Sequence, residues 1–364
     1  MFKSLRLAQS LDLELVVREF FFAYGLFTAK LFTLVLGVVL GLGLLAIILS
    51  SRSREQESIS IEKINDRLDA MREALESELL TKAEYKALQK ERNKKEKKKE
   101  KALKKNLSES KDPPQKRMFL VKFLGDLQAS EVDNLREAIT ALLSVATTND
   151  EVLIILESSG GLVHTYGLAA SQLMRIRARH IPLTVAVDLV AASGGYMMAC
   201  VANKIIAAPF AIVGSIGVLA QIPNFNRFLE KHDIDVEQHT AGKYKTTLTM
   251  LGRNTDKARE KFREELEDTH DLFKTFVNTN RPQIDIEKIA TGEHWYGAQA
   301  LDLQLIDEVL TSDDYILEKS KDTDIFEITY IINETLKEKL FSFLQNSSLK
   351  LCQKVVNIMG KLIN

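Results

Sequence analysis

Apolar residues are distributed along this chain in several distinct patterns, and each predicts a different kind of structure. From Leu31 to Leu49 the sequence is continuous, apolar and uncharged, about long enough to cross a hydrocarbon core of roughly 30 Å. We predict a transmembrane helix here, because the run is too long for the apolar region of a cleaved signal peptide. Residues 20–27, rich in phenylalanine, are expected in the membrane interface, which aromatic side chains favour.

A short helical repeat follows the predicted span. Its apolar positions, at spacings of three and four, are Ile61, Ile64, Leu68, Met71 and Leu75. Such spacing is typical of a coiled-coil seam and equally of an ordinary amphipathic helix, and two heptads leave both open. From Lys82 to Lys105 lysine and glutamate dominate, and two prolines end the stretch at Pro114. We expect a solvated helix or tether there.

After Pro114 the pattern becomes that of an alternating α/β domain. Short apolar runs predict strands at Met118–Leu124, Glu151–Leu156, Leu183–Val187 and Lys204–Ala208. Helical patterns occur at Val132–Leu143, Tyr166–Arg179, Gly195–Ala202, Thr255–Asn278 and Gly297–Leu305. The stretch 186–218 is apolar enough to suggest a second membrane span, but Asp188, the turn at Ser193 and Pro209 divide it into strand, helix and strand, and a buried parallel sheet has the same hydropathy.

These patterns divide the chain into four predicted parts. They are a membrane anchor at 1–50, a charged helical or coiled linker at 51–114, the α/β domain at 115–325 and an amphipathic tail at 326–364. The tail alternates lysine with large apolar residues from Leu336 onward. It is expected either on a membrane surface or packed against the domain or a partner subunit.

Composition narrows the classes of function. With a net charge of −1, the chain as a whole has no positive electrostatic potential that would attract nucleic acid. The two cysteines, Cys200 and Cys352, predict neither a disulfide framework nor a metal cluster, and Cys200 is expected to be a small buried residue. Since metal-binding and phosphate-loop motifs are also absent from the sequence, we expect no cofactor. Basic residues are equally frequent on the two sides of the predicted span, so the positive-inside rule does not predict its orientation in the membrane.

Four short segments carry the candidate chemistry: Leu156–Gly161, Ser193–Gly195, Val213–Val218 and Thr240–Lys245. In the second segment a serine ends a strand-like run and two glycines open a helix, which places a hydroxyl where a developing oxyanion is favoured. The paired glycines of the first segment let the backbone approach a ligand and direct its amide hydrogens toward it. Taken singly, each segment also has an ordinary structural explanation as a turn, a loop hydroxyl or a surface lysine.

In order and spacing these segments resemble the signal peptide peptidase A (protease IV) family of membrane serine proteases, and within it the SohB type. The resemblance extends from about Phe20 to Val309 and includes the runs ASGGYMMACVANKI, APFAIVGSIGV, QIPNFNRFLEKHDID and TGEHWYGAQA. It implies a ClpP/crotonase-like α/β fold of repeated ββα units and a Ser/Lys dyad.

The resemblance also assigns roles to individual residues. Ser193 is the implied nucleophile, Lys245 the general base, and Ser215 the group that orients the lysine. The backbone amides of Gly161 and Gly194 are the implied oxyanion hole. A lysine base must be neutral near pH 7, and an apolar site without a carboxylate partner makes it so.

Three further positions bear on that assignment. Composition does not distinguish Lys243 from Lys245, and only the family pattern selects the second. Ser159 stands where the family usually has proline before the paired glycines, which stiffens the turn less. Gln304 stands where a glycine is often found, at a position expected to be structural.

The expected activity is that of a membrane-anchored serine endopeptidase, which hydrolyses short hydrophobic peptides through an acyl-enzyme. Its substrates would be signal-peptide remnants or membrane-protein fragments, and its other partners the lipid bilayer and further copies of the chain, with no nucleic acid. Double-length members of the family place the serine and the lysine in different halves, whereas this chain has both in one half-sized domain. We therefore expect that several copies of the chain associate to complete the site. The family implies the bacterial cytoplasmic (inner) membrane, a single N-terminal span and a periplasmic catalytic domain.

Three alternatives remain open from the sequence. A crotonase-like acyl-CoA enzyme uses the same oxyanion turns without the dyad or the anchor. A non-catalytic membrane scaffold would use the coiled segment and the basic tail. A Ser-His-Asp triad would pair Ser193 with His164, oriented by Asp188.

Overall fold

The computed structural model describes residues 57–92 and 116–332 without interruption, together with 22, 24–39, 41–43, 94 and 97. It contains two compact units, one of residues 59–331 and one of residues 1–58 with 332–364. Within the described part of the second unit, the helix Tyr24–Gly43 is long and apolar enough to cross a membrane, judged by length and composition alone. It overlaps the predicted span 31–49, whose last six residues lie outside the described ones.

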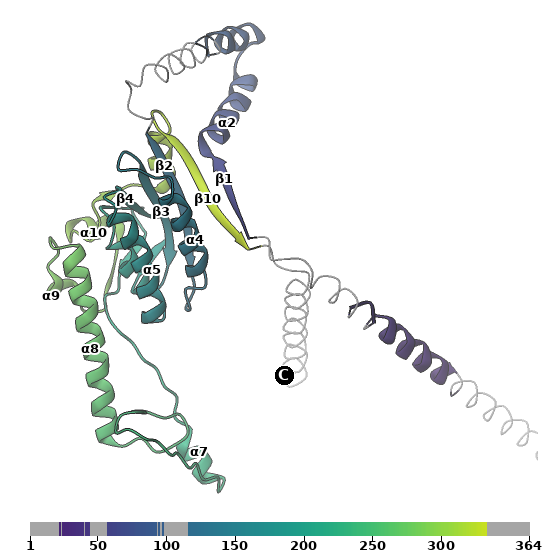
Figure 1. Ribbon diagram of the computed structural model, residues 1–364, viewed down its shortest axis with the longest axis vertical. Coiled ribbons are helices and arrows are strands. Elements are labelled where there is room, and N and C mark those ends of the chain that lie inside the picture. Colours follow the sequence, from purple (N-terminus) through teal and green to yellow (C-terminus); the bar gives the residue numbers. More distant parts are fainter. Residues whose placement is uncertain are drawn as a thin grey trace, which may run out of the picture. The chain divides into compact units, whose positions relative to one another are not determined.

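The first unit is built on a ten-stranded sheet (Figure 1). The main path of the sheet is, in order, β1 (Glu57–Lys63), β10 (Asp324–Ile332), β2 (Arg117–Gly125), β3 (Glu151–Ser158), β4 (Leu183–Val187), β6 (Lys204–Ala207) and β9 (Glu308–Val309). From β10 to β9 each neighbouring pair is parallel. Every residue of β4 is buried, which explains why the central strands read as continuous apolar runs rather than as an alternating pattern.

Three short strands branch from this path and position the site. They are β5 (Val190–Ala192), β7 (Ile212–Gly214) and β8 (His294–Tyr296). β5 is parallel to β3 through the pair Ser158 and Ala191, and parallel to β7 through the pair Ala192 and Gly214. β8 is antiparallel to β7. Because parallel strands end at the same edge, the segments that follow β3, β5 and β7 meet at one place.

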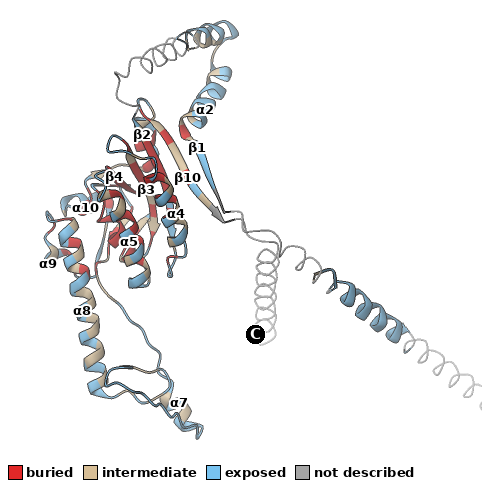
Figure 2. Ribbon diagram, in the orientation of Figure 1, coloured by how far each residue is buried: buried red, intermediate tan, exposed pale blue. Residues whose placement is uncertain are grey.

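Helices pack against the sheet and form the main core with it. The elements are α4 (Val132–Leu143), α5 (Val163–Arg177), α6 (Gly194–Ala199), α9 (Ile286–Ile289) and α10 (Gly297–Asp302). The helix α11 (Ser312–Lys319) packs through Tyr315 and Ile316 into a second, smaller cluster. In α5, Tyr166, Ala169 and Leu173 are fully buried, at the spacing of one helical face. Figure 2 shows the buried residues concentrated in the sheet and in the helix faces against it.

Only the C-terminal part of the long helix α8 (Asp256–Asn280) packs into this core. Its buried residues are Phe273 and Val277, one turn apart, and the rest of the helix is exposed or half-buried. At its end the buried guanidinium of Arg281 pairs with Asp307, with an Nη1 to Oδ2 distance of 2.8 Å. Removing one partner of such a pair strongly destabilises the folded protein, because the other charge is left buried and unpaired. The pair therefore fixes this end of α8 to the sheet.

The predicted elements of the α/β domain are confirmed with small shifts at their ends. The four predicted strands are β2, β3, β4 and β6, and the five predicted helices are α4, α5, α6, α8 and α10. The apolar stretch 186–218 forms the end of β4, then β5, α6, β6 and β7, so the decision against a second membrane span is confirmed. The α/β class is confirmed as well. Gln304 has a positive φ of 58°, which explains a family preference for glycine there.

The predicted helical repeat is divided between two elements. Ile61 lies in β1, and Ile64 opens α2 (Ile64–Leu79) and is fully buried. Met71 and Leu75 are exposed. Residues 82–92 are helical, and Arg92 makes two hydrogen bonds of 2.7 and 2.6 Å to the carboxylate of Glu76. The four predicted domain ranges stay predictions, although the sheet takes β1 from the predicted linker and β10 crosses residue 325.

Candidate active site

Ser193 lies in the sharp turn between β5 and α6. Its φ of 52° and ψ of −117° are unusual for a residue with a side chain, and such a conformation costs about 1–3 kcal/mol. Its backbone N–H donates to Gly214 O at 2.8 Å, which fixes the turn against the end of β7. The serine is half-buried, and its side chain makes no capping bond to α6 among the described residues. The position of the Ser193 hydroxyl is therefore set by the backbone of the turn and not by a capping bond to the helix.

The Gly160-Gly161 turn after β3 comes directly against this serine. A Cβ atom added to Gly160, whose φ is 88°, would lie 2.7 Å from both Ser193 Cβ and the backbone nitrogen of Gly194. A Cβ added to Gly161 would overlap Leu127 O, and one added to Gly194 would overlap the ring of Tyr166. Glycine is thus required at all three positions by close approach, and at Gly160 by its backbone conformation as well.

A small pocket opens beside these residues. It is lined by Gly161, Val163, Ser193, Gly194, Met197, Gly217, Val218, Thr269 and Phe273. Three of the five predicted site residues therefore share one concavity. Apart from Ser193 and Thr269, the side chains that line it are apolar, which suits an apolar group of a ligand.

Ser215 follows β7 as Ser193 follows β5. The pair Ala192 and Gly214 is in register, so the two serines are the next residues on adjacent strand ends. Ser215 also has a positive φ, 52°, and its N–H donates to Glu293 O at 2.6 Å. The structure thus places the backbones of Ser193 and Ser215 at neighbouring strand ends.

The next residue, Ile216, anchors this segment from two sides. Its carbonyl oxygen accepts a hydrogen bond from Gly292 N at 3.1 Å and lies 3.2 Å from His270 Nε2 of α8. Since a carbonyl only accepts, His270 carries its proton on Nε2 in this contact. The segment that carries Ser215 and lines the pocket is therefore held between the residues before β8 and the helix α8.

Lys245 lies elsewhere, on an extended segment of residues 219–255 that we call the arm. Figure 1 shows that the arm leaves the sheet and extends beside α8 as far as α7 (Asn226–Lys231). From α7 the arm returns to the first residues of α8. Next to Lys245, the ring of Tyr244 lies 5.4 Å from Lys261 Nζ. From Lys261 to the pocket residue Thr269 is about 12 Å along the helix axis. Lys245 itself is exposed, so the single chain does not bring it to Ser193.

Comparison with known proteins decides the family. A model of the N-terminal part of peptidase family S49 matches residues 19–173, and the model of peptidase family S49 matches residues 175–325. A probable protease SohB of Haemophilus influenzae is 47% identical over 334 residues, which cover 91% of this chain and 95% of that protein. The chain belongs to peptidase family S49.

Further relatives of this S49 chain carry the same description. A probable protease SohB of Buchnera aphidicola subsp. Acyrthosiphon pisum is 55% identical over 225 residues, 62% of this chain and 67% of that protein. Among solved structures, the K138A mutant of the 1510-N membrane-bound stomatin-specific protease in complex with a substrate peptide matches with a TM-score of 0.39 and 14% identity, over 64% of this chain and all of that one. The two SohB relatives confirm the resemblance to SohB-type proteases, and the chain is a peptidase by family.

The alternative triad is not assembled in this S49 chain. His164 is exposed on the first turn of α5. Asp188 accepts hydrogen bonds from the backbone N–H of Ser312 at 2.8 Å and from its hydroxyl at 2.5 Å, at the start of α11. Both carboxylate oxygens are therefore used by α11, and the acid does not orient His164.

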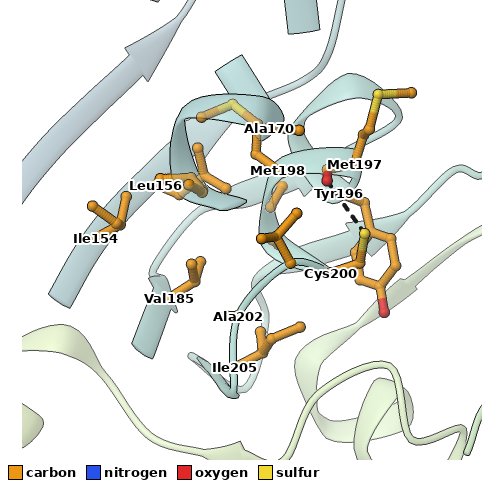
Figure 3. Packing of buried hydrophobic residues seen from close by; sticks show 14 of the residues in the cluster. Ile154, Leu156, Ala170, Val185, Tyr196, Met197, Met198, Cys200, Ala202 and Ile205 are labelled. Atoms are coloured by element: carbon orange, nitrogen blue, oxygen red, sulfur yellow. Dashed lines mark hydrogen bonds between the residues drawn. The ribbon is translucent and has the colours of Figure 1, made fainter. Parts of the chain in front are cut away.

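Cys200 is excluded as a nucleophile by its surroundings. It is fully buried at the C-terminal end of α6, where its thiol donates to Met197 O at 3.2 Å (Figure 3). Burial raises the pKa of the Cys200 thiol well above its ordinary value, so no thiolate forms near neutral pH. The expectation of a small buried residue is confirmed.

Sequence reasoning missed the side chains that support the glycine turn, Ser158 and Tyr166. Gly160 N donates to Ser158 Oγ at 3.0 Å, and Ser158 Oγ lies 2.5 Å from Tyr166 Oη. Tyr166 Oη in turn donates to Asp126 O at 2.6 Å. One signal was available, because Tyr166 falls on the apolar face of its helix and a buried tyrosine hydroxyl needs a hydrogen-bond partner.

Proposed function

We propose that this S49 chain is a membrane-anchored serine endopeptidase in which Ser193 is the nucleophile and Lys245 the general base. Ser215 orients the lysine, and the backbone N–H groups of Gly161 and Gly194 bind the oxyanion. The observation that carries the proposal is the strained Ser193 turn, which lines one pocket with both glycines. Residues with strained backbone conformations of this kind are found preferentially at active sites.

The reaction proceeds through an acyl-enzyme. Neutral Lys245 accepts the proton of Ser193 as the hydroxyl oxygen attacks the peptide carbonyl. The two amides stabilise the negative charge of the tetrahedral intermediate. Lys245 then gives its proton to the leaving amine, and water, activated by the same lysine, releases the peptide acid and restores Ser193. No cofactor or metal is needed for these steps.

Assembly of several copies would complete the site. The arm is largely exposed, and it carries several exposed apolar residues: Leu219, Ile222, Phe225, Phe228, Ile234, Val236, Tyr244, Met250 and Leu251. A surface of this kind is typical of an interaction site. We propose that arms pack against neighbouring subunits in a homo-oligomer and deliver Lys245 to the Ser193 pocket of a neighbour. The contact would also bury the lysine, as a neutral amine base requires.

The substrates would be short hydrophobic peptides, either remnants of signal peptides or fragments of membrane proteins. The apolar lining beside Ser193, with Val163, Met197 and Phe273, supports apolar side chains at the scissile bond. The candidate span Tyr24–Gly43 supports anchoring in the bacterial inner membrane, where such peptides arise. We place the catalytic domain on the periplasmic side, following the family.

Reaction with a serine-directed fluorophosphonate tests this proposal. The full-length protein in detergent or vesicles is expected to take up one label per chain, and peptide mapping should find it on Ser193. Hydrolysis of an apolar peptide should fall in parallel with labelling. A protein that hydrolyses the peptide with Ser193 unlabelled, or that reacts at another serine, would overturn the assignment of the nucleophile.

Replacing Ser215 by alanine is expected to lower kcat/KM between about tenfold and a thousandfold, less than loss of the base itself, because an orienting group contributes less than the group that transfers the proton. The measurement is steady-state hydrolysis of a soluble peptide. Ser171→Ala is a matched control, since that hydroxyl bonds only its own helix on an exposed face. Equal turnover in the Ser215 and Ser171 variants would remove Ser215 from the mechanism.

Deleting residues 1–50 is expected to release the domain from the bilayer. A span of about 20 apolar residues holds a protein essentially irreversibly, whereas a basic residue contributes only about 1 kcal/mol that salt screens. Fractionation at low and high salt measures the release, and soluble peptides should still be cleaved because every proposed catalytic residue follows Pro114. A truncated protein that resists a high-salt wash would show that another segment inserts.

A further inference from the structure

A chain of hydrogen bonds runs beneath the glycine turn, and its direction follows from its two ends. The N–H of Gly160 can only donate, so Ser158 Oγ accepts there. The carbonyl of Asp126 can only accept, so Tyr166 Oη donates there. The 2.5 Å contact between the hydroxyls therefore has Ser158 as donor and Tyr166 as acceptor. Each hydroxyl thus both donates and accepts.

The same tyrosine also contacts the other proposed oxyanion donor. A Cβ atom added to Gly194 would overlap Cγ of the Tyr166 ring, so the ring packs directly against Gly194. The absence of a side chain at Gly125 provides space for the two hydroxyls, because a Cβ there would lie 2.5 Å from Tyr166 Oη and 2.6 Å from Ser158 Oγ. Tyr166 is fully buried, and burial raises the pKa of its hydroxyl, so it remains protonated.

We infer that Tyr166, with Ser158, is a positioning residue that sets the two proposed oxyanion donors, Gly161 and Gly194, relative to one another. Its hydroxyl holds the turn at Gly160-Gly161 through Ser158, and its ring supports Gly194 from below. The inference rests on the proposed function of those amides.

Loss of the Tyr166 hydroxyl is expected to weaken binding of the transition state without affecting binding of the substrate. Oxyanion donors act where charge develops, so a small displacement lowers kcat and leaves substrate binding intact. Removing the Tyr166 hydroxyl leaves the ring beneath Gly194 but frees Ser158 and the turn. The variant Tyr166→Phe isolates this link without changing the volume of the core appreciably.

The experiment compares Tyr166→Phe with Tyr196→Phe in the full-length protein. Tyr196 is a matched control, since it is also fully buried and its hydroxyl donates to Leu305 O at 2.9 Å, away from the glycine turn. For Tyr166→Phe we expect kcat to fall by about ten- to a hundredfold with KM unchanged. Inhibition by a peptide aldehyde, which forms a tetrahedral adduct on serine, should weaken by a similar factor. Tyr196→Phe should retain kcat within about twofold.

Amide hydrogen exchange of the peptide 158–163 provides a second readout that needs no activity. Exchange there should be faster in Tyr166→Phe and unchanged in Tyr196→Phe. If Tyr166→Phe keeps both its kcat and its exchange protection, or if the two variants lose kcat equally, the inference is wrong. If the wild type has no Ser193-dependent activity, the proposed function fails instead, and hydrogen exchange still decides whether the tyrosine holds the turn.

Discussion

Ser193→Ala is expected to abolish peptide hydrolysis, with a fall in kcat on the order of 10⁴-fold or more, because loss of the nucleophile removes the acyl-enzyme route altogether. The fold should persist, since the side chain makes no capping bond to α6 and the turn is held by the backbone bond from Ser193 N to Gly214 O. Steady-state hydrolysis of an apolar peptide, paired with the thermal midpoint of unfolding, measures both expectations.

His164→Ala provides the comparison for that experiment. His164 is exposed and Asp188 is occupied by Ser312, so this variant should hydrolyse the peptide at the wild-type rate. A loss comparable to that of Ser193→Ala would restore the triad interpretation. Residual activity in Ser193→Ala at the wild-type level would show that the peptidase uses a different nucleophile.

Lys245→Ala is expected to have an effect nearly as large, on the order of 10³-fold or more in kcat/KM, because Ser193 would lose the base that accepts its proton. Lys243→Ala is the matched control. It lies on the same arm and is also exposed, with its ammonium 4.9 Å from the centre of the Tyr244 ring. Turnover that survives Lys245→Ala and fails in Lys243→Ala would transfer the role of base to Lys243.

Mixing the two inactive proteins tests where the lysine acts. If Lys245 serves the pocket of a neighbouring subunit, co-assembly of Ser193→Ala chains with Lys245→Ala chains creates some sites with both residues intact, and part of the activity returns. If the dyad forms within one chain, no mixture regains activity. The geometry of the single chain, with Lys245 exposed on the arm and absent from the pocket lining, leads us to expect recovery.

The central strands and the site turns were predictable because their determinants are local. Leu183–Val187 is a strand with the predicted bounds, since a short, mainly apolar run between Pro182 and Asp188 has few alternatives in a parallel sheet. The glycines at 160, 161 and 194 were noticed for the same reason. A position that must accommodate close backbone contact admits only glycine, and that restriction is visible in the sequence.

Other features depend on contacts between distant segments and were not predictable. β1 and β10 lie side by side in the sheet although more than 250 residues separate them in the chain. Their strand character appears only when a partner edge is present, because strand propensity depends on context. The same holds for Met71 and Leu75, whose spacing predicts burial and which are exposed in the described structure.

The amino-acid sequence alone predicted the α/β class, the candidate span, the family and the residues that are proposed to carry the chemistry. It did so through local patterns, namely apolar periodicity and small residues at tight turns. Three features required the folded structure: Ser193 and Ser215 follow the ends of adjacent strands, the ring of Tyr166 packs against Gly194, and Lys245 is exposed on the arm. These are consequences of strand register and helix packing, which join residues far apart in the chain and so leave no local signal.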